Sequence, residues 1–214
     1  MEDVLDVYQR PIDPKRPLVT LDEGSKQLLH DSREPIPMQP VRSEQPGHPV
    51  REDYEYVRDG TCSFFMTFAP LLFWRHVAVT ERRTAKDFAH VVRDLVDLHF
   101  PDADKIVLVL DNLNTHTAAS LYEAFPPAEA KRIADKLEIH YTPKHGSWLN
   151  MAEIELSVLG RQCLDRRLPD VDTLKSEVLA WEQARNTAGI TVNWHFTTED
   201  ARIKLTKLYP NVLP

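Results

Sequence analysis

The sequence predicts an α/β fold in which helices cover a mixed β-sheet, and two patterns carry this prediction. Short apolar runs rich in β-branched and aromatic residues lie at 17–21, 53–80, 105–110 and 137–141, and such runs form strands. Apolar residues at helical spacing follow them, first after Thr84. Chains that combine strands and helices in this way fold into layered α/β architectures.

The N-terminal half is expected to supply most of the sheet. Residues 17–21 predict a buried strand that ends at Asp22, Glu23 and Gly24, which places two carboxylates at its C-terminal end. Residues 25–51 hold five prolines and are expected to be an ordered but irregular insertion. Residues 53–80 indicate three antiparallel strands, two of which meet at a turn at Ala69-Pro70.

The C-terminal half is expected to alternate helices with strands. Thr84 is a typical N-cap for an amphipathic helix that stops at Phe100-Pro101. The run KIVLVL at 105–110 is almost wholly apolar, which favours a strand in the middle of the sheet, covered on both faces. Further along we expect a helix over 115–136 broken at Pro126-Pro127, a strand over 137–141, a helix over 150–164 and a last helix capped by Asp170.

Composition limits the functional classes. The 214 residues suit one domain, or one domain with an appendage. The formal charge of −7 argues against coating nucleic acid by bulk charge but leaves room for a local basic groove. Cys62 and Cys163 fit a reduced cytosolic compartment and form no zinc motif. No signal peptide is expected, and the apolar stretch 62–74 is too short to span a membrane.

Three acidic residues are candidates for metal chemistry. Asp22 and Asp111 each follow a predicted strand, and Glu153 lies in the first turn of a predicted helix. If the two strands are neighbours in the sheet, the aspartates lie side by side, and their repulsion raises the pKa of each unless a cation lies between them. Mg²⁺ prefers such oxygen ligands. Three carboxylates can hold two ions about 3.5–4 Å apart, as in phosphodiester chemistry.

Simpler structural roles stay open for the same residues. Either aspartate could merely end a strand, since Asp favours turns. Asn150-x-x-Glu153 has the spacing of a capping box, in which the Glu153 carboxylate would bind the helix N-terminus. Glu155 is the neighbouring acid, but two residues along a helix it points away from Glu153.

Residues near the acids could support the site. Asn112 and His116 could orient a metal-bound water or a phosphate beside Asp111, or they could belong to a turn and the following helix. Lys144, His145 and Trp148 could contact a DNA backbone and stack on an unpaired base, although Trp148 could instead pack its loop against the core. Arg82 and Arg83 form a basic pair that is either a phosphate contact or a solvated surface.

Four segments taken together resemble a known family. They are LDEG at 21–24, YEYVRDGT at 54–61, VLVLDNLNTH at 107–116 and HGSWLNMAEIE at 145–155. The chain is similar to the mariner-related bacterial insertion-sequence transposases of the DDE superfamily. The most specific parts are D-N-x-x-x-H and S-W-L-N-x-x-E, in this order.

The resemblance implies an RNase H-like fold, a mixed sheet flanked by helices. It maps the family's three acids onto Asp22, Asp111 and Glu153, and it implies metal-dependent cleavage and strand transfer of DNA with Mg²⁺ or Mn²⁺, two ions in all. A DDE catalytic domain is then expected over 17–168 with an irregular insertion at 25–52. Residues 1–16 would be a linker-like lead-in and 169–214 a C-terminal helical extension.

One feature of the family has no counterpart. About 20 residues precede Asp22, too few for the helix-turn-helix region with which such transposases recognise element ends. We expect a bacterial, cytoplasmic and nucleoid-associated catalytic core that acts on DNA as a homodimer, with a separate helix-turn-helix chain as a candidate partner. The alternatives are an RNase H-like nuclease without strand transfer and an inactive remnant that serves as an interaction module.

Overall fold

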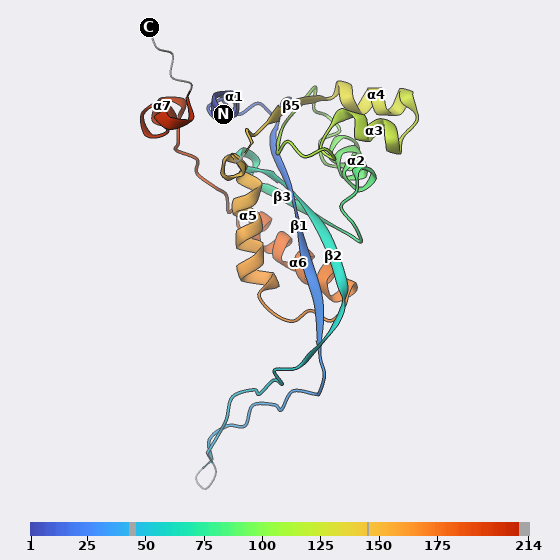
Figure 1. Cartoon of the computed structure of the whole chain (residues 1–214), viewed down its shortest axis with the longest axis vertical. Helices are drawn as coiled ribbons and strands as arrows, with labels where there is room; N and C mark the ends of the chain where they lie inside the picture. Colours follow the sequence, from blue (N-terminus) through green and yellow to red (C-terminus); the bar gives the residue numbers. More distant parts are fainter. Residues whose placement is uncertain (43–45, 145, 210–214) are drawn as a thin grey trace.

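The computed structural model describes residues 1–42, 46–144 and 146–209 (Figure 1). They form one five-stranded sheet in the order β3-β2-β1-β4-β5. β1, β2 and β3 pair in antiparallel fashion, whereas β1, β4 and β5 are parallel. The predicted mixed sheet is therefore confirmed. The bounds are β1 Leu18–Asp31, β2 Tyr56–Ala69, β3 Trp74–Thr80, β4 Ile106–Leu110 and β5 Leu137–Tyr141.

β4 explains why the core has two halves. All five of its residues are buried, as expected for a strand covered on both faces. Because side chains alternate along a strand, Val107 and Val109 join the cluster on one face of the sheet. Ile106, Leu108 and Leu110 join the cluster on the other face.

Each face is covered by its own set of helices. α2 (Ala85–Asp94, continued by a π-helical turn over Leu95–His99), α3 (Ala118–Ala124) and α4 (Pro127–Asp135) cover one face. α1 (Glu2–Tyr8), α5 (Met151–Leu159, continued by a π-helical turn over Gly160–Leu164), α6 (Val171–Thr187) and α7 (Thr198–Lys204) pack on the other. Short 3₁₀ turns lie at Pro70–Leu72, Ser147–Leu149 and Thr206–Leu208.

The predicted helix boundaries are largely confirmed. Thr84 caps α2 in a capping box with Asp87. Asp170 caps α6 by accepting from the Thr173 N–H. The predicted break at Pro126-Pro127 separates α3 from α4.

Several expectations about the strands were wrong. β1 does not end before Asp22 but continues to Asp31, and it pairs with β2 from Thr20 to Asp31 with one register shift between Gln27 and Leu29. Residues 25–31 thus belong to a strand. β2 is one long strand where two were expected, so residues 53–80 form two strands instead of three. The β1–β2 hairpin projects from the body (Figure 1), so its outer residues lack the apolar pattern of a buried strand. Beyond it, residues 32–55 are irregular apart from isolated bridges at Ile36–Arg51 and Gln39–His48.

Two helices were missed at the ends of the chain. The lead-in forms α1, whose Val4, Leu5, Val7 and Tyr8 are buried. α6 is not the last helix, because α7 follows it and contacts α1. Each has seven residues, too few for a helical period to stand out, and tertiary packing stabilises such short helices. Within residues 1–42, 46–144 and 146–209, no helix is both long and apolar enough to cross a lipid bilayer.

Candidate active site

The first two predicted acids lie at the same end of two neighbouring strands. β1 and β4 are parallel neighbours, and Thr20 pairs with Val109. Asp22 and Asp111 each lie two residues beyond this pair. The condition under which the two aspartates were expected to lie side by side, that their strands are neighbours, is therefore met. Asp22 is 8% exposed. Glu153 is half-buried on α5 and lines the same cavity as Asp22.

The electrostatics of Asp22 report this crowding. The pKa of Asp22 is raised to about 7, mainly by burial. The nearby carboxylates of Glu23, Asp111 and Glu153 act in the same direction, and a hydrogen bond from the Glu23 backbone N–H acts against them. That N–H donates to Asp22 Oδ1 at 2.8 Å. A divalent cation would offset the repulsion, and carboxylate oxygens are the ligands that hard cations prefer.

Asn150 connects the first acid to the helix of the third. Its Nδ2 donates to the Leu21 carbonyl at 2.8 Å and to Asp22 Oδ2 at 3.4 Å, and its Oδ1 accepts from the Ala152 N–H at 3.1 Å. Asn150 is therefore the N-cap of α5. Its own backbone N–H donates to Ser147 O at 2.6 Å, so the alternative of a capping box with Glu153 is wrong.

Glu155 points away from Glu153, as expected. It is buried between two arginines, with Arg75 Nε at 3.0 Å from Oε2 and Arg185 Nη2 at 2.9 Å from Oε1. Arg75 is fully buried in β3 and also donates to Asn186 Oδ1. This ion triad ties α5 to β3 and α6, and the sequence prediction did not include it.

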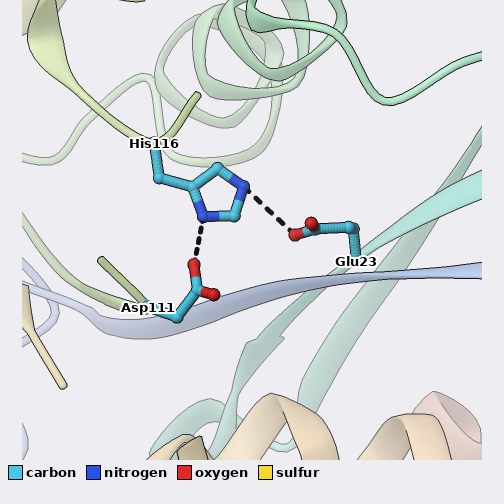
Figure 2. A group of neighbouring side chains, drawn as sticks. All are labelled: Glu23, Asp111 and His116. Carbon is cyan, nitrogen blue, oxygen red and sulfur yellow. Dashed lines mark hydrogen bonds and ion pairs between the residues drawn. The ribbon is translucent and has the colours of Figure 1, made fainter. Parts of the chain in front are cut away.

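A second cluster joins His116 to two carboxylates (Figure 2). His116 Nδ1 lies 2.5 Å from Asp111 Oδ1, and Nε2 lies 3.1 Å from Glu23 Oε2. The ring is 1% exposed and lies 4.7 Å from that of Phe88 in α2, centroid to centroid. Burial disfavours the imidazolium, but the bonds to Asp111 and Glu23 outweigh it and raise the pKa of His116 to about 9.

Glu23 is a partner of His116 that the sequence prediction did not include. Successive residues of a strand point to opposite faces, so Asp22 faces Asn150 while Glu23 faces His116. Ligand-type atoms of Glu23, Asp111 and His116 all lie within 4.8 Å of one another. Because the two ring nitrogens contact different carboxylates, the contacts are those of an imidazolium bridging two anions rather than of one shared ion. The D-N-x-x-x-H spacing was the available signal for His116.

The predicted basic pair and Asn112 lie around this cluster. Asn112 is exposed just after β4. Arg83 is exposed, and its Nη1 lies 3.8 Å from Glu23 Oε1. Arg82 is exposed in the same loop before α2. The structure therefore brings Arg83 to the rim of the site, whereas Asn112 and Arg82 make no side-chain contact with the acids among the described residues.

The loop before α5 carries the remaining predicted residues. Lys144 is exposed, and His145 lies outside the described residues. Trp148 is 43% exposed, and its ring meets that of Phe196 edge-on at 5.6 Å. Trp148 thus packs on the C-terminal segment and keeps part of its ring open to solvent.

The sheet order, the helices on both faces and the neighbouring acids define an RNase H-like fold, and comparison with known structures confirms it. The Mos1 strand transfer complex matches with a TM-score of 0.57 and 15% identity, covering 88% of this chain and 54% of that chain. The Mos1 transposase paired-end complex with the left transposon end matches with a TM-score of 0.57 and 16% identity, covering 88% of this chain and 55% of that chain. A pre-cleavage Mos1 transpososome matches with a TM-score of 0.57 and 15% identity, covering 88% of this chain and 55% of that chain.

The sequence gives the family. The model of the DDE superfamily endonucleases matches residues 17–175, and the chain belongs to this family. No curated protein matches the sequence. The chain spans about half the length of the Mos1 chains that it matches, and at this level of identity the likeness concerns the fold.

Proposed function

We propose that the chain is the catalytic core of a DNA transposase, which cleaves the ends of an insertion element and transfers the strand to target DNA. One observation carries the proposal: Asp22 in β1 and Asp111 just after β4 lie at equivalent positions beyond the paired residues of two parallel neighbouring strands, and Asn150 links Asp22 to the helix of Glu153. Membership of the DDE superfamily endonucleases supports it. So does the fold shared with the Mos1 strand transfer and paired-end complexes.

The donor set fits hard divalent cations. Asp22, Asp111 and Glu153 would hold two Mg²⁺ or Mn²⁺ ions. The raised pKa of Asp22 supports this, because nearby carboxylates contribute to the shift and a bound cation would offset their charge. Bound there, such ions lower the pKa of a water or 3′-hydroxyl and stabilise the leaving oxygen of an in-line displacement.

The surrounding residues would hold the acids in place. Asn150 fixes one oxygen of Asp22 and begins α5, so it sets where Glu153 stands. His116 contacts Oδ1 of Asp111, which would leave Oδ2 for a metal ion, and Glu23 contacts the other ring nitrogen of His116. Partners of this kind orient metal ligands in many sites.

DNA would approach over the exposed rim. Arg83 and Arg82 are candidates for phosphate contacts, as are Lys144 and His145. The open part of the Trp148 ring could stack on an unpaired base. A homodimer would bring two element ends together, and a separate helix-turn-helix chain would supply sequence recognition.

The experiment is cleavage of DNA carrying the ends of the element, in Mg²⁺ or Mn²⁺, by the wild type and by Asp111→Asn. Asp135→Asn, on the exposed end of α4, is the matched control. We expect nicking by the wild type and the control and none by Asp111→Asn. Equal cutting by Asp111→Asn would overturn the assignment, as would an inert wild type even with a helix-turn-helix partner supplied.

A second assay separates transposase from nuclease. Pre-cleaved ends with free 3′-hydroxyls are incubated with plasmid DNA, and joined products are counted. Joining supports strand transfer. Hydrolysis without joining assigns the chain to the RNase H-like nucleases instead, and no reaction in either assay favours an inactive interaction module.

A further inference from the structure

A trench leads away from the acids between β1 and α5, which lie side by side in Figure 1. Its cavity volume is about 710 Å³. Asp22 and Glu153 line it, as do Lys26 and Arg161. The trench is therefore continuous with the proposed site of reaction.

Small residues form much of its walls. Gly24 and Ser25 come from β1, and Ser157 and Gly160 come from α5 and the turn after it. Gly24 lies directly on the Phe64 ring, since a Cβ at position 24 would stand 2.5 Å from Phe64 Cε2. The small side chains thus leave space between β1 and α5, and the Phe64 ring lies at the bottom of the trench.

The cations of the trench are free to meet an anion. Arg161 is exposed, its Nε donates to Ser157 O at 3.3 Å, and it forms no ion pair within the described part of the chain. Nearby Arg166 and Arg167, in contrast, pair with Glu177 and Asp31. Lys26 is half-buried, and its Nζ donates to Leu164 O at 2.5 Å.

Most anions of the trench lie at the end next to the proposed site. Asp22, Glu23 and Glu153 belong to that site, where cations would offset them, whereas Asp165 lines the end that holds Arg161 and Lys26. From Glu153 to Arg161 the helix advances by about 12 Å at 1.5 Å per residue. That span covers a few nucleotides of a single strand.

We propose that this trench, from Asp22 and Glu153 to Arg161, binds a single DNA strand next to the scissile phosphate. Arg161 would contact a phosphate a few nucleotides away from the reacting one, and Lys26 would contribute positive charge beside it. β1 and α5 pack against each other, so a strand rather than a duplex fits between them. The inference rests on the proposed function, because that function places the scissile phosphate at Asp22 and Glu153.

Binding without cleavage tests the trench directly. The probe is a fluorescein-labelled oligothymidine of about twelve nucleotides, longer than the trench, measured by anisotropy in Ca²⁺ at low salt. Arg161→Glu should weaken binding on the order of tenfold, the worth of one charge-assisted hydrogen bond. It should also reduce the slope of log affinity against log salt by about 0.7.

Two further variants keep the test decisive. Ser157→Phe fills the trench without changing charge and should also weaken binding. Lys131→Glu, on exposed α4 at the far side of the sheet, should leave binding unchanged. No binding by the wild type overturns the proposal, and so does equal binding by the wild type, Arg161→Glu and Ser157→Phe.

Failure of the trench and failure of the proposed function look different. If the wild type cleaves DNA ends but neither trench variant affects binding, the trench is wrong and the function stands. If the variants weaken binding but the wild type never cleaves, the trench stands as a strand-binding surface and the function fails. Substrates trimmed on the 5′ or the 3′ side of the cleavage site then show which segment occupies it, because only loss of that segment removes the effect of Arg161→Glu.

Discussion

The side-chain amide of Asn150 donates to the carboxylate of Asp22 at 3.4 Å, and through this contact the cap of α5 and the first acid form one unit. The same amide satisfies the buried carbonyl of Leu21 at 2.8 Å. Loss of Asn150 should therefore disturb both the fold and the proposed site.

Asn150→Ala should lower the free energy of unfolding by about 2–4 kcal/mol, combining a lost N-cap with an unsatisfied buried carbonyl. Asp170→Ala, which removes the exposed cap of α6 alone, should cost only about 1 kcal/mol. Urea denaturation followed by circular dichroism measures both. Equal losses in the two variants would show that the Leu21 and Asp22 contacts contribute nothing.

The raised pKa of Asp22 predicts how metal and pH together affect stability. Its pKa of about 7 in the folded protein lies above the ordinary value of 3.8, so the folded state binds the proton more tightly than the unfolded chain. Without metal, stability should decline as pH rises from about 4 to about 7. Mn²⁺ binds the ionised carboxylate, so the rise in Tm on adding Mn²⁺ should grow over the same range.

Asp22→Asn is the control for this dependence. His116, with its pKa raised to about 9, also contributes stability that is present below 6.5 and lost as pH rises through 9. The variant removes the Asp22 contribution and keeps that of His116. Thermal melts with EDTA and with Mn²⁺ should therefore show a small, nearly constant Mn²⁺ effect in Asp22→Asn, and a pH-dependent effect of wild-type size there would contradict the prediction.

The bridge between Glu23 and Asp111 predicts a role for His116 in positioning. His116→Ala leaves the two carboxylates without their shared cation and frees the Asp111 side chain to rotate. We expect metal affinity or cleavage to fall by about 10–100-fold, as for other residues that orient metal ligands. Cleavage measured against Mn²⁺ concentration should show a higher metal requirement.

His90→Ala is the matched variant, because His90 is exposed on α2 and packs on Phe125 instead of on an acid. It should leave the metal requirement unchanged. If no Mn²⁺ concentration restores the activity of His116→Ala, the Tm of the variant decides the cause. A lowered Tm would point to misfolding, whereas a Tm near that of the wild type would contradict the positioning role.

How much of the fold could be predicted depended on where each segment is buried. The run at 105–110 was predicted as a central strand because both its faces are covered, and the pattern after Thr84 because α2 covers one face of the sheet. Residues 25–31 belong to a strand whose outer part projects from the body, and Leu28 alone among them is buried, so their composition does not show the alternation of a half-buried strand. The helix of residues 2–8 is too short to show a period.

The candidate site divides in the same way. The sequence predicted Asp22 and Asp111 at the ends of strands and Glu153 in the first turn of a helix. The structure has Asp22 within β1, Asp111 just after β4 and Glu153 in α5, and the parallel pairing of β1 with β4 brings the two aspartates to the same end of the sheet. The Glu23 contact depends on which face of β1 meets His116, which requires the register of the sheet. A buried arginine such as Arg75 could not be predicted either, because within LLFWRHVAV an arginine is expected to face solvent.

The buried triad of Glu155, Arg75 and Arg185 predicts a large loss on disruption. Glu155→Gln leaves two guanidiniums in the interior without a counter-charge. Breaking such a pair costs about 3–5 kcal/mol. Glu177→Gln, which breaks the exposed pair with Arg166, should cost at most about 1 kcal/mol. Urea denaturation compares them, and similar values for both would show that the triad is solvated in the folded protein.

The contact between Gly24 and Phe64 predicts a compensating pair of substitutions. Gly24→Ala places a methyl group 2.5 Å from the edge of the Phe64 ring, so the ring must shift within a packed core. We expect a loss of about 1–3 kcal/mol in the free energy of unfolding, the usual effect of overpacking. Adding Phe64→Leu should remove the clash, so the two substitutions together should destabilise by less than the sum of their separate effects.

Gly160→Ala, whose new methyl group meets nothing within 4 Å, should not destabilise. Additive losses in the double variant would mean that the Phe64 ring already has room to move aside.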